Sequence, residues 1–182
     1  SIRKYHKKKI PDRSDSQKIR ARRLCGQLYR NYRDHEWVLD DESYFTLKHS
    51  IINGNNLFYS SDVSITPNDT KYVTQKKFDG KLLVWIAISS NKMSKVYIAP
   101  SGTAINGQIY LEQCIKKRLV PFIKDLYENN QYIFWPDLAS AHYSKNVIEY
   151  LESEKIQFIK KVENPPNVPE CRCIEDFWSC LK

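Results

Sequence analysis

This sequence has no apolar stretch long enough to cross a lipid bilayer. Its strongest apolar run covers residues 82–88, whereas a membrane-spanning helix needs about 20 apolar residues. The chain starts with Ser1 rather than Met, and no positively charged segment followed by an apolar one opens it. A secretory signal peptide is therefore not expected. We expect a cytosolic or nuclear protein fragment that has no membrane partner.

The number and spacing of the cysteines do not favour a disulfide or zinc framework. The chain has five cysteines, an odd number, and no secretory context, so reduced thiols are expected. A zinc site would have to combine His142 with Cys171, Cys173 and Cys180. Only one residue separates Cys171 from Cys173, which is closer than the usual spacing of a zinc knuckle. The spacing disfavours structural zinc.

Positive charge is concentrated at one end of the chain. The net charge is +8 over 182 residues, and residues 1–33 contain twelve Lys or Arg against two Asp, a net +10. The remaining 149 residues therefore carry a net −2. Such a segment favours binding to a polyanion through counterion release, although a solvated linker or a nuclear localisation patch remains an alternative. The residues predicted to bind DNA are Arg3, Lys4, Lys7, Lys8, Lys9, Arg20, Arg22 and Arg23.

Hydrophobic periodicity predicts one α/β domain after the basic segment. A helix is expected over residues 14–32, since its apolar residues fall three and four apart. Residues 1–33 are then a basic linker and helix, and residues 34–182 form the domain. The domain is predicted to contain three strands, a helix, a strand, a helix, a strand and a helix. These elements cover residues 36–41, 81–89, 95–99, 109–127, 132–135, 144–153, 156–159 and 173 onwards.

This order of elements is that of a ribonuclease-H-like fold, with a mixed five-stranded sheet flanked by helices. Residues 81–89 are apolar without alternation, so this strand is expected to be a central one, covered on both faces. A turn at Asn91 then leads into residues 95–99, and the two strands are expected to form an antiparallel hairpin.

Carboxylates stand where three of these elements begin or end. Asp40 and Asp41 close the first strand, and Glu175 opens the last helix. Asp137 follows Pro136, which cannot donate a ladder hydrogen bond and so ends the fourth strand. A period of two sends Asp40 and Asp41 to opposite faces, so only one of them can point into a shared site. Acids on separate elements fit a centre in which two hard divalent ions assist phosphoryl transfer.

Each of these acids also has a structural explanation. Asp137 could cap the helix that begins near Ser144. Glu175 could complement the dipole of its own helix, and Asp41 could be a turn residue at a strand end. On the residues alone, these alternatives stay open.

Three segments, in chain order, resemble the transposases of the Tc/mariner superfamily, which have an Asp-Asp-Glu/Asp catalytic triad. Residues 38–45 (VLDDESYF) are similar to the segment that carries the first metal ligand of the family. The Trp-Pro-Asp motif at residues 135–137, with His142 five residues later, is similar to the segment of the second ligand. Residues 167–182, with the Ile-Glu-x-x-Trp start of the last helix, are similar to the segment of the third. The resemblance covers residues 15–182.

The resemblance implies the catalytic domain of a cut-and-paste DNA transposase. Asp41, Asp137 and Glu175 are then the catalytic triad and the ligands of two Mg²⁺ or Mn²⁺ ions, with His142 as an accessory residue. The implied partners are double-stranded DNA, as transposon ends and as target, and a second copy of the full-length protein in a homodimer. The implied location is the nucleus.

Some positions depart from the family pattern. Thirty-seven residues (138–174) lie between Asp137 and Glu175, which indicates a variant with a longer spacing than the best-known members. Leu138 stands where Asn is common, and Cys173 stands where Pro is common. The paired helix-turn-helix region that reads transposon ends is missing, and we expect the domain to be truncated within its last helix. The alternatives are a ribonuclease-H-like nuclease that acts on other nucleic acids and an inactive DNA-binding relic.

Overall fold

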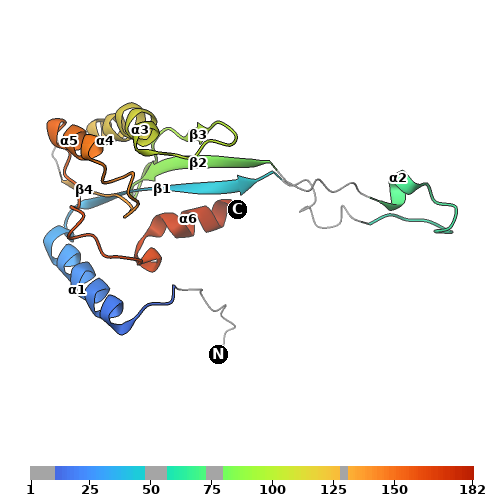
Figure 1. The fold of residues 1–182 in the computed structure, drawn as a ribbon, viewed down its shortest axis with the longest axis horizontal. Coiled ribbons are helices and arrows are strands. Elements are labelled where there is room, and N and C mark those ends of the chain that lie inside the picture. The colour runs from blue at the N-terminus through green and yellow to red at the C-terminus, as the bar shows by residue number, and fades with distance from the viewer. Residues whose placement is uncertain (1–10, 48–56, 73–79, 128–130) are drawn as a thin grey trace.

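The fold is built on a mixed sheet that has four strands within the residues that the structure describes. This computed structural model describes residues 11–47, 57–72, 80–127 and 131–182. The strands are β1 (Glu36–Thr46), β2 (Lys81–Ile88), β3 (Tyr97–Ala99) and β4 (Tyr132–Trp135), in the spatial order β3-β2-β1-β4 (Figure 1). β2 runs antiparallel to β1 and β3, whereas β4 runs parallel to β1. The mixed α/β fold, the hairpin and the inner position of β2 are thus confirmed.

Helices cover both faces of the sheet (Figure 1). One face carries a continuous helical segment and α5, and the other carries α1 and α6. Their bounds are α1 (Asp15–Tyr32), α3 (Gly107–Ile109), η2 (Tyr110–Leu119), α4 (Val120–Leu126), α5 (Lys145–Ser153) and α6 (Cys173–Leu181). Two short elements, α2 (Asn68–Lys71) and η3 (Pro169–Cys171), lie in the connections. No helix within the described ranges is long and apolar enough to span a membrane.

Alternation along β1 sends neighbouring side chains into two separate cores. Val38 is buried with residues of η2, α4 and α5, whereas Leu39 is buried with residues of α1 and α6. Because the pleat of a strand has a period of two, Asp40 faces the η2 side and Asp41 faces the α6 side. The hydrogen bonds of the two aspartates agree with this division. The predicted opposite orientation of Asp40 and Asp41 is confirmed.

The basic N-terminal segment joins the fold through α1. Ser14 and Gln17 form a capping box, in which each side chain accepts a hydrogen bond from the backbone amide of the other residue. Ala21 and Leu28 are buried in the core on the α6 side. The helix predicted over residues 14–32 is confirmed, with Ser14 as its cap.

Residues 156–159 do not form the predicted fifth strand. They pair with β4 through a single parallel bridge between Phe134 and Phe158. The Gln157 amide donates to the side-chain hydroxyl of Tyr132 at 3.3 Å. This hydroxyl takes the place of a main-chain carbonyl of β4 as the acceptor for Gln157. The described sheet therefore has four strands rather than five, although residues 156–159 run along its expected edge.

The helix predicted over residues 109–127 is longer and less regular than expected. It begins at Gly107, where the Asn106 side chain accepts a hydrogen bond from the first turn, and its middle is wound with i→i+5 bonds. Such wide turns often occur at functional sites. Here the wide turns begin at Tyr110, which contacts Asp40.

Candidate active site

The first strand does not end at Asp41 as predicted, because it continues with β2 to Thr46. Asp41 therefore lies in the middle of β1, beside the point where β4 ends. β1 pairs with β4 from Glu36 to Leu39, and beyond Leu39 it continues with β2. The indole N–H of Trp178 on α6 donates to Oδ2 of Asp41 at 2.9 Å. Trp178 is itself buried at 4% exposure. Core packing on the α6 side therefore fixes the orientation of this carboxylate.

The Asp41 carboxyl binds its proton more tightly than an ordinary aspartate. Burial is the main cause that raises its pKa, and the charge of Glu175 raises it further, from 3.8 to about 7. Glu175 is exposed in the first turn of α6. The structure thus brings Asp41 and Glu175 together, and a bound cation would relieve the repulsion between them.

Asp137 follows two residues after β4 ends, where the parallel pairing of β1 and β4 also stops. Leu39 pairs with Trp135, and both side chains are buried in the core on the α6 side. Asp41 and Asp137 each follow two residues later in the chain, and the charge of Asp137 acts on His142 and Tyr143. Asp137 is half-buried. It is not the cap of α5, because Ser144 occupies the N-cap position.

The three predicted metal ligands fit a divalent cation by chemical type but do not form one cluster as they stand. Within the described ranges, no group of three or more His, Cys, Asp or Glu side chains is arranged to hold a metal ion. Two of the three acids, Asp41 and Glu175, interact through their charges. Carboxylate oxygens are the donors that Mg²⁺ and Mn²⁺ prefer. The residues present therefore fit such ions on the condition that Asp137 joins the pair when an ion binds.

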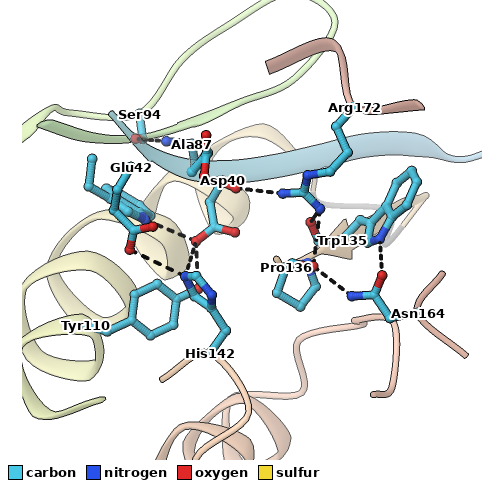
Figure 2. Close-up of polar contacts among 12 residues, drawn as sticks. Asp40, Glu42, Ala87, Ser94, Tyr110, Trp135, Pro136, His142, Asn164 and Arg172 are labelled. Carbon is cyan, nitrogen blue, oxygen red and sulfur yellow. Dashed lines mark hydrogen bonds and ion pairs between the residues drawn. The ribbon is translucent and has the colours of Figure 1, made fainter. Parts of the chain in front are cut away.

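Asp40 is a fully buried carboxyl on the opposite side of β1 (Figure 2). Its Oδ2 accepts a hydrogen bond from the Trp85 indole at 3.0 Å and from the Tyr110 hydroxyl at 2.6 Å. Burial is the main cause that raises the pKa of Asp40, and the nearby His142 opposes the rise. At 0% exposure, Asp40 has a structural role in the core on the η2 side.

His142 belongs to the buried network around Asp40 (Figure 2). Its Nε2 lies 3.7 Å from Oδ2 of Asp40 and 3.5 Å from Oε1 of Glu42. Its ring packs edge-on against Tyr110, with the ring centres 4.1 Å apart. Burial lowers the pKa of the imidazole, but the charge of Asp40, the hydrogen bond and charge of Glu42, and the charge of Asp137 together raise it by more. The accessory role of His142 stays a prediction, and from this position it would act through Asp40 and Glu42.

Arg172 and Asn164 hold the end of β4, and neither was predicted from the sequence (Figure 2). Both are buried, and Arg172 donates hydrogen bonds to main-chain carbonyls of β1 and β4. The Asn164 side chain accepts from the Trp135 indole at 2.7 Å and donates to the Pro136 carbonyl at 2.8 Å. The available signal for Arg172 was a lone cation three residues before Glu175.

The residues predicted to bind DNA are described in part. Arg20, Arg22 and Arg23 are exposed on α1, as a contact with backbone phosphates requires. The other five, Arg3, Lys4, Lys7, Lys8 and Lys9, lie outside the described residues.

The metal-free protein should lose stability as the pH rises through neutrality, in part because of Asp41. The pKa of Asp41 is about 7 in the folded protein and 3.8 ordinarily, so the folded state binds this proton more tightly than the unfolded state does. The resulting stabilisation is complete below about pH 4 and is lost as the pH rises through about 7. Asp41→Asn remains neutral at every pH and should flatten the fall.

Thermal melts in EDTA, at several values between about pH 4 and pH 8, measure this effect. Asp34→Asn is the control, because Asp34 is exposed just after α1. This control should keep the slope of the wild type. Parallel curves for the wild type and Asp41→Asn would show that Asp41 does not carry a raised pKa in solution.

Comparisons with known proteins bear on the fold. No protein-family model and no curated protein matches the chain. Among solved structures, the Mos1 transposase paired-end complex with the left transposon end matches with a TM-score of 0.69 and 16% identity, over 100% of this chain and 52% of that chain. The catalytic domain of the Mos1 mariner transposase matches with a TM-score of 0.65 and 14% identity, over 94% of this chain and 72% of that chain.

A structure of the Mos1 catalytic domain with raltegravir and Mg matches with a TM-score of 0.56 and 16% identity, over 82% of this chain and 64% of that chain. A counterpart with Mn also matches. The chain spans only 53% and 52% of the Mos1 chains in the pre-cleavage transpososome and the paired-end complex. At these identities the likeness shows the fold alone: the chain has the mixed α/β fold of the Mos1 mariner transposase catalytic domain.

Proposed function

We propose that this chain is part of the catalytic domain of a cut-and-paste DNA transposase. Such an enzyme cleaves and transfers DNA strands with the help of divalent metal ions. The observation that carries the proposal is the meeting of Asp41 on β1 with Glu175 on α6, beside the end of β4 from which Asp137 follows. The fold shared with the Mos1 mariner transposase catalytic domain supports it.

In this proposal Asp41, Asp137 and Glu175 hold two Mg²⁺ or Mn²⁺ ions. Such ions, when bound, activate a water or a 3′-hydroxyl and stabilise the leaving oxygen of the phosphodiester. Asp41 must release its proton near neutral pH, which a pKa of about 7 allows. Trp178 donates its N–H to one Asp41 oxygen and so orients the carboxylate that would bind an ion. Structures of the Mos1 catalytic domain with Mg and with Mn support the choice of ions.

The proposed substrate is double-stranded DNA, as transposon ends and as target. The exposed Arg20, Arg22 and Arg23 would contact backbone phosphates from α1. Mos1 transposase has been solved in a paired-end complex with a transposon end and in a strand transfer complex, which supports DNA as the partner. Because a cut-and-paste reaction acts on two ends, we also propose that the full-length protein works as a homodimer, in the nucleus.

An inactive DNA-binding relic of a transposase is the second candidate. Leu138 and Cys173 replace residues that are common in the family. In addition, no three acids in the described part of the chain are arranged to hold a metal ion as they stand. A relic would bind DNA without cleaving it, so a cleavage assay separates the two candidates.

Supercoiled plasmid DNA incubated with this chain and Mn²⁺ should be nicked to the open circular form. Changes in residues that merely support metal ligands cost about 10–100-fold, so loss of a ligand in Glu175→Gln should cost more than about 100-fold. Glu152→Gln, an exposed change on α5, is the control. Absence of nicking by the wild type would favour the relic, and equal nicking by Glu175→Gln would contradict the role of Glu175. Preferential cleavage of an RNA–DNA hybrid would favour a nuclease of another specificity.

A further inference from the structure

Arg172 is a buried cation in the gap where β4 ends and β1 continues (Figure 2). It is 7% exposed. Its Nη2 donates to the Asp40 carbonyl at 2.7 Å, and its Nη1 donates to the carbonyls of Trp135 and Pro136 at 3.2 Å each. The guanidinium carbon also lies 5.5 Å from the centre of the Trp135 ring. One side chain thus ties the end of β4 to β1.

The main chain of β1 needs another hydrogen-bond donor beyond the end of β4, because Pro136 interrupts the ladder between β1 and β4. Even-numbered residues of β1 turn their main-chain groups toward β4, as the hydrogen bond from the Glu36 amide to the Gln131 carbonyl shows. Asp40 is the first such residue beyond the paired region. A buried carbonyl without a donor destabilises a fold. The planar fork of Arg172 supplies the N–H groups that a longer β4 would have supplied.

The carbonyls that Arg172 binds belong to the peptide bonds that lead into two of the predicted ligands. One is the carbonyl immediately before Asp41, and another is the carbonyl immediately before Asp137. The third ligand is tied to the same residue, because the Arg172 carbonyl accepts a hydrogen bond from the Glu175 amide at 3.1 Å. The Arg172 side chain is therefore bonded directly before two of the acids, and its main-chain carbonyl is bonded to the third.

We propose that Arg172 is a positioning residue that sets the spacing of Asp41, Asp137 and Glu175 before any ion binds. This role rests on the function proposed above. Since Arg172 uses main-chain acceptors, it leaves the carboxylate oxygens of the three acids available to ions. A lysine carries its charge on a flexible stem without the planar fork. Arg172→Lys therefore retains the charge but only part of the hydrogen bonding.

The test compares Arg172→Gln and Arg172→Lys with the matched control Arg118→Gln. Arg118, on η2, also donates to two main-chain carbonyls, those of Val96 at 3.1 Å and Gln113 at 2.5 Å. Its guanidinium also lies over a ring, that of Tyr97. Each full chain is measured in two ways. Amide hydrogen exchange is followed in EDTA, and the Mn²⁺ dissociation constant is obtained by calorimetry.

We expect Arg172→Gln to speed amide exchange at residues 39–42, 136–138 and 173–176, with the rest of the chain unchanged. Mn²⁺ binding should weaken by about 10–100-fold, as for other residues that orient metal ligands. Arg172→Lys should fall between Arg172→Gln and the wild type in both measurements. Arg118→Gln should keep the exchange of these three segments and the Mn²⁺ affinity of the wild type.

Wild-type Mn²⁺ affinity in a folded Arg172 variant would overturn the positioning role. An even rise of exchange over the whole chain would also overturn it, because that pattern reports general stability. If the wild type binds no Mn²⁺, the proposed function fails, and the exchange pattern alone decides whether Arg172 positions these segments. If Arg172→Gln does not fold, Arg172→Lys carries the comparison.

Discussion

We expect Mn²⁺ to raise the melting temperature of the wild-type protein by about 5–11 °C when the ion is present at about 100 times its dissociation constant. At this excess a ligand that binds only the folded state stabilises it by about 2.7 kcal/mol. In a chain of this size, 1 kcal/mol corresponds to about 2–4 °C. Asp137→Asn should abolish the rise and the strand cleavage, since it replaces a charged ligand of hard cations by a neutral one.

Without metal, Asp137→Asn should have the opposite effect on stability. The proposed site gathers a third negative charge at the Asp41 and Glu175 pair, which Asp137→Asn would remove, so the metal-free variant should be at least as stable as the wild type. Loss of a helix cap would instead destabilise the protein with or without metal. The N-cap position of α5 is occupied by Ser144, which favours the first outcome.

Asp125→Asn provides the matched control for this comparison. Asp125 is exposed on α4, on the other face of the sheet, so its substitution should leave the metal-dependent rise intact. Thermal melts of the wild type and both variants, with and without Mn²⁺, make the measurement. A rise in Asp137→Asn equal to that of the wild type would contradict the role of Asp137 as a ligand.

Asp40→Ala should reduce the free energy of unfolding by about 2–6 kcal/mol, because it leaves two buried donors without an acceptor at about 1–3 kcal/mol each. These donors are the Trp85 indole and the Tyr110 hydroxyl, on side chains that are fully buried. His142 also loses an acidic neighbour. Asp40→Asn keeps an acceptor oxygen and should cost less.

Denaturant unfolding of the wild type, Asp40→Ala and Asp40→Asn measures this loss. Asp41→Asn is the matched variant at the neighbouring position, on the other face of β1. It should keep its stability and lose Mn²⁺-dependent nicking, whereas Asp40→Asn should keep nicking. If Asp40→Asn loses nicking and Asp41→Asn keeps it, Asp40 is the metal ligand and Asp41 has the structural role.

Local sequence patterns predicted most of the fold because they depend on neighbours along the chain. The period of two separated Asp40 from Asp41, and Pro136 marked the end of β4 correctly. The fifth strand failed for a non-local reason. Residues 156–159 have the composition of a strand, but the strand beside them has only four residues. The Tyr132 hydroxyl then takes one of the amides that a ladder would use.

The candidate site was predictable where it depends on acidic side chains and not where it depends on the main chain. Acidic side chains are visible in a sequence, although β1 runs beyond Asp41 to Thr46, and the family resemblance chose Asp41 over Asp40. Arg172 binds carbonyl groups, which every residue has, and one of its acceptors is 132 positions away in the sequence. No pattern marks such an acceptor. His142 likewise faces Glu42 and Asp40 through packing against Tyr110, which the sequence does not encode locally.

Crystals of the chain soaked in Mn²⁺, with diffraction recorded near the manganese absorption edge, test most directly whether Asp41, Asp137 and Glu175 form one two-metal site. We predict two anomalous peaks about 3.5–4 Å apart, as in two-metal centres generally. Both should lie among these three carboxylates on the α6 side of β1. Peaks confined to the buried network around Asp40, or no ordered Mn²⁺ between Asp41 and Glu175, would contradict the two-metal site.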